Sequence, residues 1–116
     1  MLPMGMSFNA QCAALLHDVV EDTPTTLDDL SFIFSERTVW LVDKLSRPEG
    51  PNRPTYKNWI RSIIATGDRE LITIKMVDNE HNMSHDRMSQ LPPEMRDIIK
   101  RYEWSHAALS KALEEL

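Results

Sequence analysis

Two short segments of the chain concentrate side chains that bind metal ions and accept protons. In the first, His17 and Asp18 are adjacent and are followed by Glu21 and Asp22. The second contains Asp78, far along the chain. An imidazole nitrogen combined with carboxylate oxygens suits Mn²⁺, Fe²⁺ or Zn²⁺ better than Mg²⁺ or Ca²⁺, which prefer oxygen ligands alone. The pattern predicts a divalent metal site, and hydrolysis of a phosphate ester is its leading interpretation.

Helices would place these donors on defined faces. On a helix from about residue 10 to 20, His17 and Asp18 are about 100° apart, so both side chains can lean toward one point. Asp78 comes one turn after Ile74. The same stripe continues with polar residues, His81, Asn82 and His85. A buried carboxylate needs a partner, and a cation shared by Asp78, His17 and Asp18 is an economical one. A single His-Asp pair at a helix end is ordinarily solvated or capping, so the prediction depends on both segments together.

The elements that must position these residues are helices, because apolar residues recur with a helical period. The clearest stripe is Tyr56, Trp59, Ile60, Ile63 and Ile64. Pro54 before it suits a first turn and Gly67 after it suits a helix stop, so a helix is expected from about Thr55 to Thr66. No segment alternates with a β period over a useful length. The chain is therefore predicted to be all-α.

Three further helices follow from similar patterns. Two are expected over about residues 27–34 and 37–45, and Thr25 with Asp28 resembles a capping box before the first of them. A last helix is expected after Pro92-Pro93, with a packing seam of Ile98, Tyr102, Ser105, Leu109, Ala112 and Leu116. Residues 46–53 are the one obvious long loop. The predicted architecture is a compact bundle of about five to six helices.

The composition limits the class of protein. The 116 residues, 41% of them apolar, suffice for a single core, so residues 1–116 are predicted to form one domain. A net charge of -5 argues against nucleic acid and anionic membranes as partners and favours a small ligand or a protein. Cys12 is the only cysteine, and neither a signal peptide nor a membrane-spanning apolar run is present. A cytoplasmic protein is expected.

Longer stretches carry a resemblance to a known family. The segments LLHDVVEDTPTTLDDL, LVDKLSR and IKMVDNEHNMS closely resemble the HD-domain phosphohydrolases, nearest the alarmone hydrolase branch. Residues 17–22 read HDVVED and residues 75–82 read KMVDNEHN, close to the family signatures HDxxED and KxADxxxN, and the similarity extends from about Ala13 to Leu113. The resemblance implies an all-α fold and one Mn²⁺ ion, with Fe²⁺ or Zn²⁺ as alternatives. It also implies removal of the 3′ pyrophosphate from guanosine tetra- or pentaphosphate, or from a related nucleotide.

The resemblance also implies a role for each matching residue. The implied metal ligands are His17, Asp18 and Asp78, the residues that orient or deprotonate water are Glu21 and Asp22, and the nucleotide contact is Asn82. A bound divalent ion makes water more acidic and polarises a phosphoryl oxygen, while a neighbouring carboxylate takes the proton. These roles agree with the chemistry of the donor set.

A basic segment offers further contacts for an anionic substrate. Between Asp43 and Arg61 the chain is net positive and contains the predicted loop. Lys44 and Arg47 are the candidate phosphate contacts, and a solvated basic face is the alternative interpretation. Aromatic residues of the last helix, Tyr102 and Trp104, fit the core better than a ligand site. The remaining histidines, His81, His85 and His106, are interpreted as structural or surface residues.

The chain departs from the family pattern at three places, one of which is the absence of an Arg or Lys from the expected phosphate end. The family draws its first metal ligand from a histidine on an earlier helix, and no histidine precedes His17 here. The chain is therefore expected to lack the family's first helix and to bind metal more weakly. Asn79 also stands where the family often has a basic residue. The preferred nucleotide of this chain therefore stays open.

Two alternatives to the alarmone hydrolase follow from these departures. One is a truncated, non-catalytic HD module that binds a partner or forms a homo-oligomer, because a missing helix would expose apolar surface. The other is an HD hydrolase of a different nucleotide phosphate, because substrate choice depends on the rim of the site and not on the fold.

Overall fold

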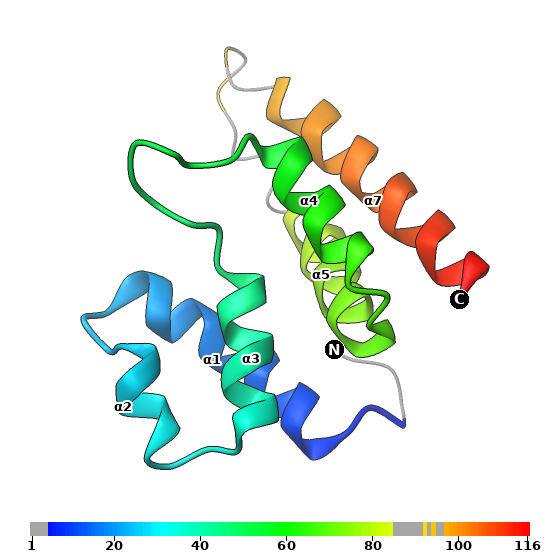
Figure 1. Cartoon of the computed structure of the whole chain (residues 1–116). Helices are drawn as coiled ribbons and strands as arrows, with labels where there is room; N and C mark the ends of the chain where they lie inside the picture. Colours follow the sequence, from blue (N-terminus) through cyan, green and yellow to red (C-terminus); the bar gives the residue numbers. More distant parts are fainter. Residues whose placement is uncertain (1–4, 85–91, 93, 95–96) are drawn as a thin grey trace. The chain divides into compact units, whose positions relative to one another are not determined.

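The computed structural model describes residues 5–84, 92, 94 and 97–116, and within them the regular structure is entirely helical (Figure 1). The helices are α1 (Phe8–Asp22), α2 (Leu27–Ser31), α3 (Glu36–Leu45), α4 (Tyr56–Ala65), α5 (Arg69–Asn82) and α7 (Asp97–Glu115). The all-α prediction is confirmed. None of these helices combines the length and the apolar character needed to cross a membrane. The chain divides into two compact units, Met1–Trp59 and Ile60–Leu116, with the division inside α4.

Local capping sets where the helices of the first unit begin. The Ser7 hydroxyl accepts a hydrogen bond from Ala10 N at 3.1 Å, which satisfies an orphan donor at the start of α1. Helix α2 begins with a capping box in which Thr26 Oγ1 accepts from Asp29 N and Asp29 Oδ2 accepts from Thr26 N. The predicted box at Thr25 was therefore wrong by one residue. Both threonines have an aspartate three residues later, and only the observed start of the helix distinguishes them.

Helix α3 packs against both other helices of the first unit. On α1 its neighbours are small, since Ala10 and Ala13 are fully buried, and small side chains let two helix backbones approach closely. The buried apolar side chains of this unit are Ala10, Ala13, Leu30, Leu41, Val42, Leu45 and Trp59. The Thr38 hydroxyl also donates to Asn9 Oδ1 at 3.1 Å, which joins α3 to the first turn of α1. This polar contact fixes the N-terminal ends of the two helices against each other.

The helix expected over residues 27–34 is shorter than predicted, since α2 ends at Ser31. The amides of Ile33 and Phe34 both donate to the Leu30 carbonyl, at 3.0 and 2.8 Å, so the chain turns there. Phe32 and Ile33 continue the apolar run of the sequence and are nevertheless 87% and 77% exposed. Apolar content alone therefore gave a wrong end for this helix.

The long loop after α3 is closed by side chains. Arg47 donates from Nε and Nη2 to the Pro54 carbonyl at 3.1 and 2.9 Å, and its guanidinium lies 5.9 Å from the centre of the Tyr56 ring. The Trp59 indole donates to the Lys44 carbonyl at 3.3 Å. These contacts join the two ends of the loop between α3 and α4.

In the second unit, α4 ends and α5 begins within a few residues. Gly67 has φ of 64°, the left-handed conformation that a glycine adopts at low cost after a helix, so the predicted stop is confirmed. Asp68 then caps α5, because its Oδ1 accepts from Leu71 N at 3.0 Å. The buried apolar side chains of this unit are Ile60, Ile63, Leu71, Ile72, Ile74 and Leu109.

Helices α5 and α7 pack side by side and share a buried polar contact. Asn79 and Ser105 are both fully buried, and Asn79 Nδ2 donates to Ser105 Oγ at 2.8 Å. The Ser105 hydroxyl donates in turn to the Tyr102 carbonyl at 3.1 Å. The predicted seam of α7 is confirmed at Ser105 and Leu109, whereas Leu116 is 49% exposed and does not belong to the core. Asn79 is therefore a core residue that joins two helices.

The substitution Ser105→Ala should destabilise the fold, because it takes a hydrogen bond from an amide that has no access to water. The expected loss is about 1–3 kcal/mol of unfolding free energy, the usual cost of leaving a buried polar group short of a partner. Urea denaturation followed by circular dichroism measures it as a lower midpoint at unchanged slope. Ser110→Ala is the matched control on α7, since the half-buried Ser110 hydroxyl donates to the Met76 sulfur, a weak acceptor. Equal midpoints for the two variants would show that the Asn79 contact contributes no more to stability than the contact of Ser110 with Met76.

Candidate active site

His17 lies on α1 and is 8% exposed. Its ring nitrogen Nδ1 lies 2.8 Å from the Ala14 carbonyl oxygen, one turn earlier in the same helix. A carbonyl oxygen only accepts, so Nδ1 carries a proton and donates it. In the neutral ring the lone pair is then on Nε2, which is the form of histidine that binds a metal ion through that atom.

The same hydrogen bond fixes the orientation of the ring. Histidines that bind metals almost always donate the other ring N–H to a carboxylate, a water or a backbone carbonyl. Burial of the His17 side chain restricts the imidazole further. The chemistry and tautomer of His17 therefore fit a metal ligand.

Three other residues of the first motif also lie on α1. Asp18, Glu21 and Asp22 belong to the last turns of the helix, whose final residue is Asp22. Their side chains lie outside the described part of the structure. Their predicted roles, as a metal ligand and as the groups that orient water, stay predictions.

Asp78 lies on α5 and forms an ion pair with a buried lysine. Lys75 Nζ donates to Asp78 Oδ2 at 2.9 Å, and the two side chains are 9% and 25% exposed. A carboxylate has two oxygens with about four acceptor positions, so a lysine on Oδ2 is compatible with a cation on the same group. The pair occurs at i, i+3 on one helix, a spacing that brings side chains together. Lys75 belongs to the second motif, and no role was predicted for it from the sequence.

The other motif residue on α5 is Asn82, one turn after Asp78. Asn82 is the last residue of the helix and is half-buried. Asn79, between them, faces α7 and is committed to Ser105. Asn79, which departs from the family pattern, is therefore part of the α5–α7 core. Its hydrogen bond to Ser105 explains why a polar side chain can be buried there. The buried pair was missed because it requires knowledge of which helices are neighbours.

The predicted phosphate contacts lie at the end of α3. The Lys44 side chain is exposed. The Arg47 guanidinium is occupied by the Pro54 carbonyl and the Tyr56 ring, as described above. A contact between either residue and a phosphate stays a prediction, and Arg47 has a structural role in the loop besides.

The remaining aromatic and histidine predictions have mixed outcomes. Trp104 and Tyr102 are half-buried, and the Arg61 guanidinium lies 5.4 Å from the centre of the Trp104 ring. His106 Nε2 lies 3.0 Å from Glu80 Oε1 in a surface pair, and His81 is exposed, so both are surface residues as predicted. His85 lies outside the described residues.

Each unit therefore contains one of the two motifs. The first unit has His17, Asp18, Glu21 and Asp22 on α1, and the second has Asp78 and Asn82 on α5. Among the side chains that the structure describes, no group of three or more His, Cys, Asp or Glu residues could hold a metal ion. Asp18, Glu21 and Asp22 are not among those side chains. The joint ligand set stays a prediction from the sequence.

The chain is similar in sequence to much longer bacterial proteins. It is 33% identical over 104 residues to the bifunctional (p)ppGpp synthase/hydrolase SpoT of Escherichia coli K12, an alignment that covers 84% of the chain and 14% of that protein. A guanosine-3′,5′-bis(diphosphate) 3′-pyrophosphohydrolase of Haemophilus influenzae is 34% identical over 104 residues, or 84% of the chain and 15% of the relative. A probable GTP pyrophosphokinase of Mycobacterium leprae is 37% identical over 95 residues, or 78% of the chain and 12% of the relative.

The chain thus spans only a small part of the length of these relatives. No protein-family model matches it, and no solved structure matches it significantly. The similarity to the relatives nevertheless extends over most of the chain and agrees with the resemblance carried by the two motifs.

Proposed function

Because the chain is a homologue of the HD-type (p)ppGpp hydrolases over most of its length, we propose that it is a metal-dependent phosphohydrolase that acts on a guanosine 3′-pyrophosphate. The reaction would release pyrophosphate from the 3′ position of guanosine tetra- or pentaphosphate by attack of water. Several of the relatives are themselves named guanosine-3′,5′-bis(diphosphate) 3′-pyrophosphohydrolase. The similarity to these relatives is the observation that carries the proposal.

His17, Asp18 and Asp78 are the proposed metal ligands, and Mn²⁺ is the proposed ion. The tautomer of His17 supports this, because its Nδ1–H is held by the Ala14 carbonyl at 2.8 Å. One nitrogen and two carboxylate donors suit Mn²⁺, with Fe²⁺ or Zn²⁺ as alternatives. The ion would supply Lewis-acid chemistry, making water a better nucleophile and polarising a phosphoryl oxygen.

The remaining motif residues would handle the proton and the substrate. Glu21 and Asp22 are carboxylates on the same helix as His17, and we propose that they orient the attacking water and accept its proton. Lys75 would hold the Asp78 carboxylate in one orientation through the 2.9 Å contact to Oδ2. Asn82 has an amide that can both donate to and accept from a nucleotide.

The basic residues at the end of α3, Lys44 and Arg47, are proposed phosphate contacts, and they differ in how available their side chains are. Lys44 is exposed and presents a mobile point charge, which suits a phosphate group. Arg47 would have to exchange the Pro54 carbonyl for a phosphate oxygen. We therefore propose Lys44 as the first of the two to test.

A second candidate function is a non-catalytic module that associates with a partner or with itself. The observation that favours it is the exposed apolar surface of α1, where Phe8 and Leu15 are each 77% exposed. Large apolar side chains that remain exposed in a folded protein often mark an interaction site. A concentration-dependent molecular mass in the absence of phosphohydrolase activity would favour this function.

The proposed substrate is tested with a panel of phosphate esters in the presence of Mn²⁺. We expect guanosine tetraphosphate to yield GDP and pyrophosphate in equal amounts, and nucleoside monophosphates to be unreactive. Separation of the products by ion-exchange chromatography identifies which bond is cleaved. Preferred hydrolysis of a different nucleotide would support the proposed phosphohydrolase activity but would contradict the proposal that guanosine tetraphosphate is the substrate.

A further inference from the structure

The first unit contains a pocket that the proposed function does not use. It lies between α2 and α3 and has a volume of about 340 Å³. Most of its lining is apolar, from Leu27, Phe34, Val39 and Trp40. Its ionisable lining residues are Glu36 and Asp43, two turns apart on α3. Pockets of this size, apolar with a few polar groups, are typical of places where a ligand or an anchoring side chain binds.

Two exposed apolar residues adjoin the pocket lining in the sequence. Phe32 and Ile33 directly precede the lining residue Phe34, and they are 87% and 77% exposed. Trp40 is half-buried, and the Arg37 guanidinium lies 5.3 Å from the centre of its ring. Large exposed apolar residues next to an apolar pocket are a feature that often marks protein contacts, and we treat Phe32, Ile33 and the pocket as one candidate patch.

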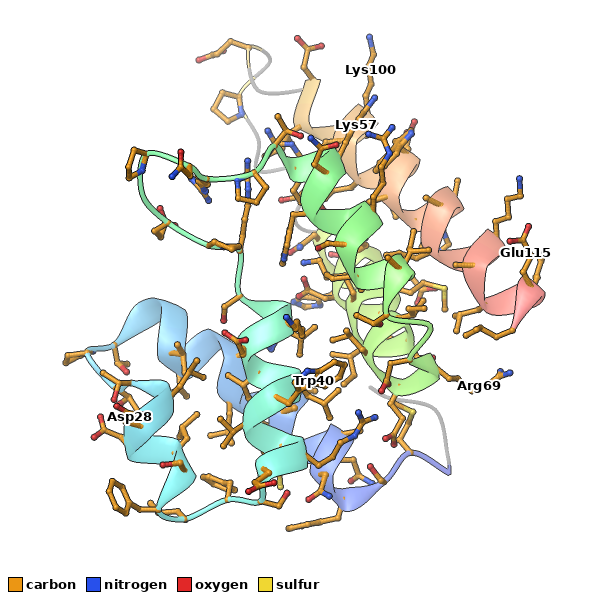
Figure 2. All side chains as sticks on the ribbon, in the orientation of Figure 1. Asp28, Trp40, Lys57, Arg69, Lys100 and Glu115 are labelled. Carbon is orange, nitrogen blue, oxygen red and sulfur yellow. The ribbon has the colours of Figure 1, made fainter. Side chains whose placement is uncertain are left out.

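The charges around this patch are mainly negative. Asp28 and Asp29 occupy the first turn of α2, and Figure 2 labels Asp28 there and Trp40 on α3. Glu36 and Asp43 add two carboxylates at the pocket itself. Arg37 and Lys44 are the basic residues on α3, so the segment from α2 to α3 remains net negative. A partner that covers the patch must bring positive charge together with apolar side chains.

We propose that the α2–α3 surface, defined by Leu27, Phe32, Ile33, Glu36, Trp40 and Asp43, docks a basic amphipathic helix of another protein. A groove between two helices accepts the apolar face of a third helix, with anchors at i, i+3, i+4 and i+7. Lysines or arginines flanking those anchors would meet Glu36 and Asp43. A second copy of this chain fits poorly, because a two-fold contact would place the same acidic residues against each other.

The test uses synthetic peptides as probes of the full chain. The first is a fluorescein-labelled helical peptide of about 18 residues with leucines on one face and lysines on the other. The second has glutamate in place of every lysine. Fluorescence anisotropy at low salt measures the Kd of each. We expect the basic peptide to bind saturably and the acidic peptide not to bind.

Two variants locate the binding. Glu36→Lys together with Asp43→Lys reverses the charge at the pocket, and both residues are exposed, so the fold should persist. We expect it to raise the Kd of the basic peptide about tenfold or more. Phe32→Ser together with Ile33→Ser removes the apolar extension without changing the charge, and should also raise the Kd. Glu114→Lys with Glu115→Lys, exposed on α7, is the control with the same change of net charge.

Each other result overturns the proposal. An equal rise of Kd in the α7 control would mean that the peptide senses only net charge. Absence of saturable binding at peptide concentrations up to about 1 mM would mean that the patch does not bind basic helices. Self-association of the chain in sedimentation experiments, abolished by the Phe32 and Ile33 changes, would assign the surface to a second copy.

Discussion

The variant Asp78→Ala should lose bound metal and phosphohydrolase activity together. Asp78 is one of three proposed ligands, and removing even an outer-shell partner of a metal site typically costs about 10–100-fold in affinity. Loss of a direct ligand should cost at least as much. Metal content after gel filtration, measured by mass spectrometry in the sample used for the activity assay, tests both losses at once.

The ion pair with Lys75 requires a second variant at this position. Asp78→Ala removes the carboxylate from a 9% exposed ammonium, and deleting one partner of a buried ion pair destabilises a fold. Asp78→Asn keeps the shape and still accepts a hydrogen bond from Lys75, so it separates loss of the ligand charge from loss of structure. Glu80→Ala is the control on the same helix, where Glu80 forms an exposed pair with His106. Full activity in a folded Asp78→Asn variant would show that the carboxylate charge is dispensable, and full activity in a folded Asp78→Ala variant would remove Asp78 from the ligand set.

The variant Glu21→Gln should have a different signature, with metal retained and turnover reduced. A positioned general base typically contributes about 10²–10⁴-fold to a rate, so kcat should fall by a factor in that range. KM for the nucleotide should change little, because glutamine keeps the size of the side chain. Steady-state kinetics of pyrophosphate release, together with the metal content of the same protein, measure these quantities.

Asp22→Asn is the companion experiment, since two adjacent carboxylates are candidates for the same role. The more damaging of the two substitutions identifies the base. Glu115→Gln, on the exposed end of α7, makes the same chemical change away from both motifs and should leave the kinetics unaltered. If kcat is unchanged in both α1 variants, neither residue handles the proton.

The helices were largely predictable because their signals are local. The stripe around Ile60 and Ile63, followed by Gly67, predicted α4 and its end to within about one residue. The start of α2 was predicted correctly at about residue 27, but its cap was assigned to Thr25 instead of Thr26. The two threonines are equally good caps by sequence. The end of α2 failed for a different reason. Phe32 and Ile33 are apolar but exposed, and the sequence does not report whether an apolar residue has anything to pack against.

The candidate site was predictable as a set of residue types and not as a set of contacts. The motifs placed His17 on one helix and Asp78 on another, as the structure does. The hydrogen bond from His17 to Ala14 depends on the rotamer, which no sequence pattern determines. The pair Lys75 and Asp78 could have been found from its i, i+3 spacing. The contact of Asn79 with Ser105 could not, because it depends on the packing of α5 against α7.

The most direct test of the account is pyrophosphate release from guanosine tetraphosphate by the metal-depleted chain, with and without added Mn²⁺. Metal content and helical circular dichroism are measured in the same samples. We predict release of GDP and pyrophosphate only when Mn²⁺ is present and bound, and loss of that release on adding a chelator. A folded, Mn²⁺-loaded chain that releases no pyrophosphate, or release that is independent of metal, would contradict the proposed metal-dependent phosphohydrolase.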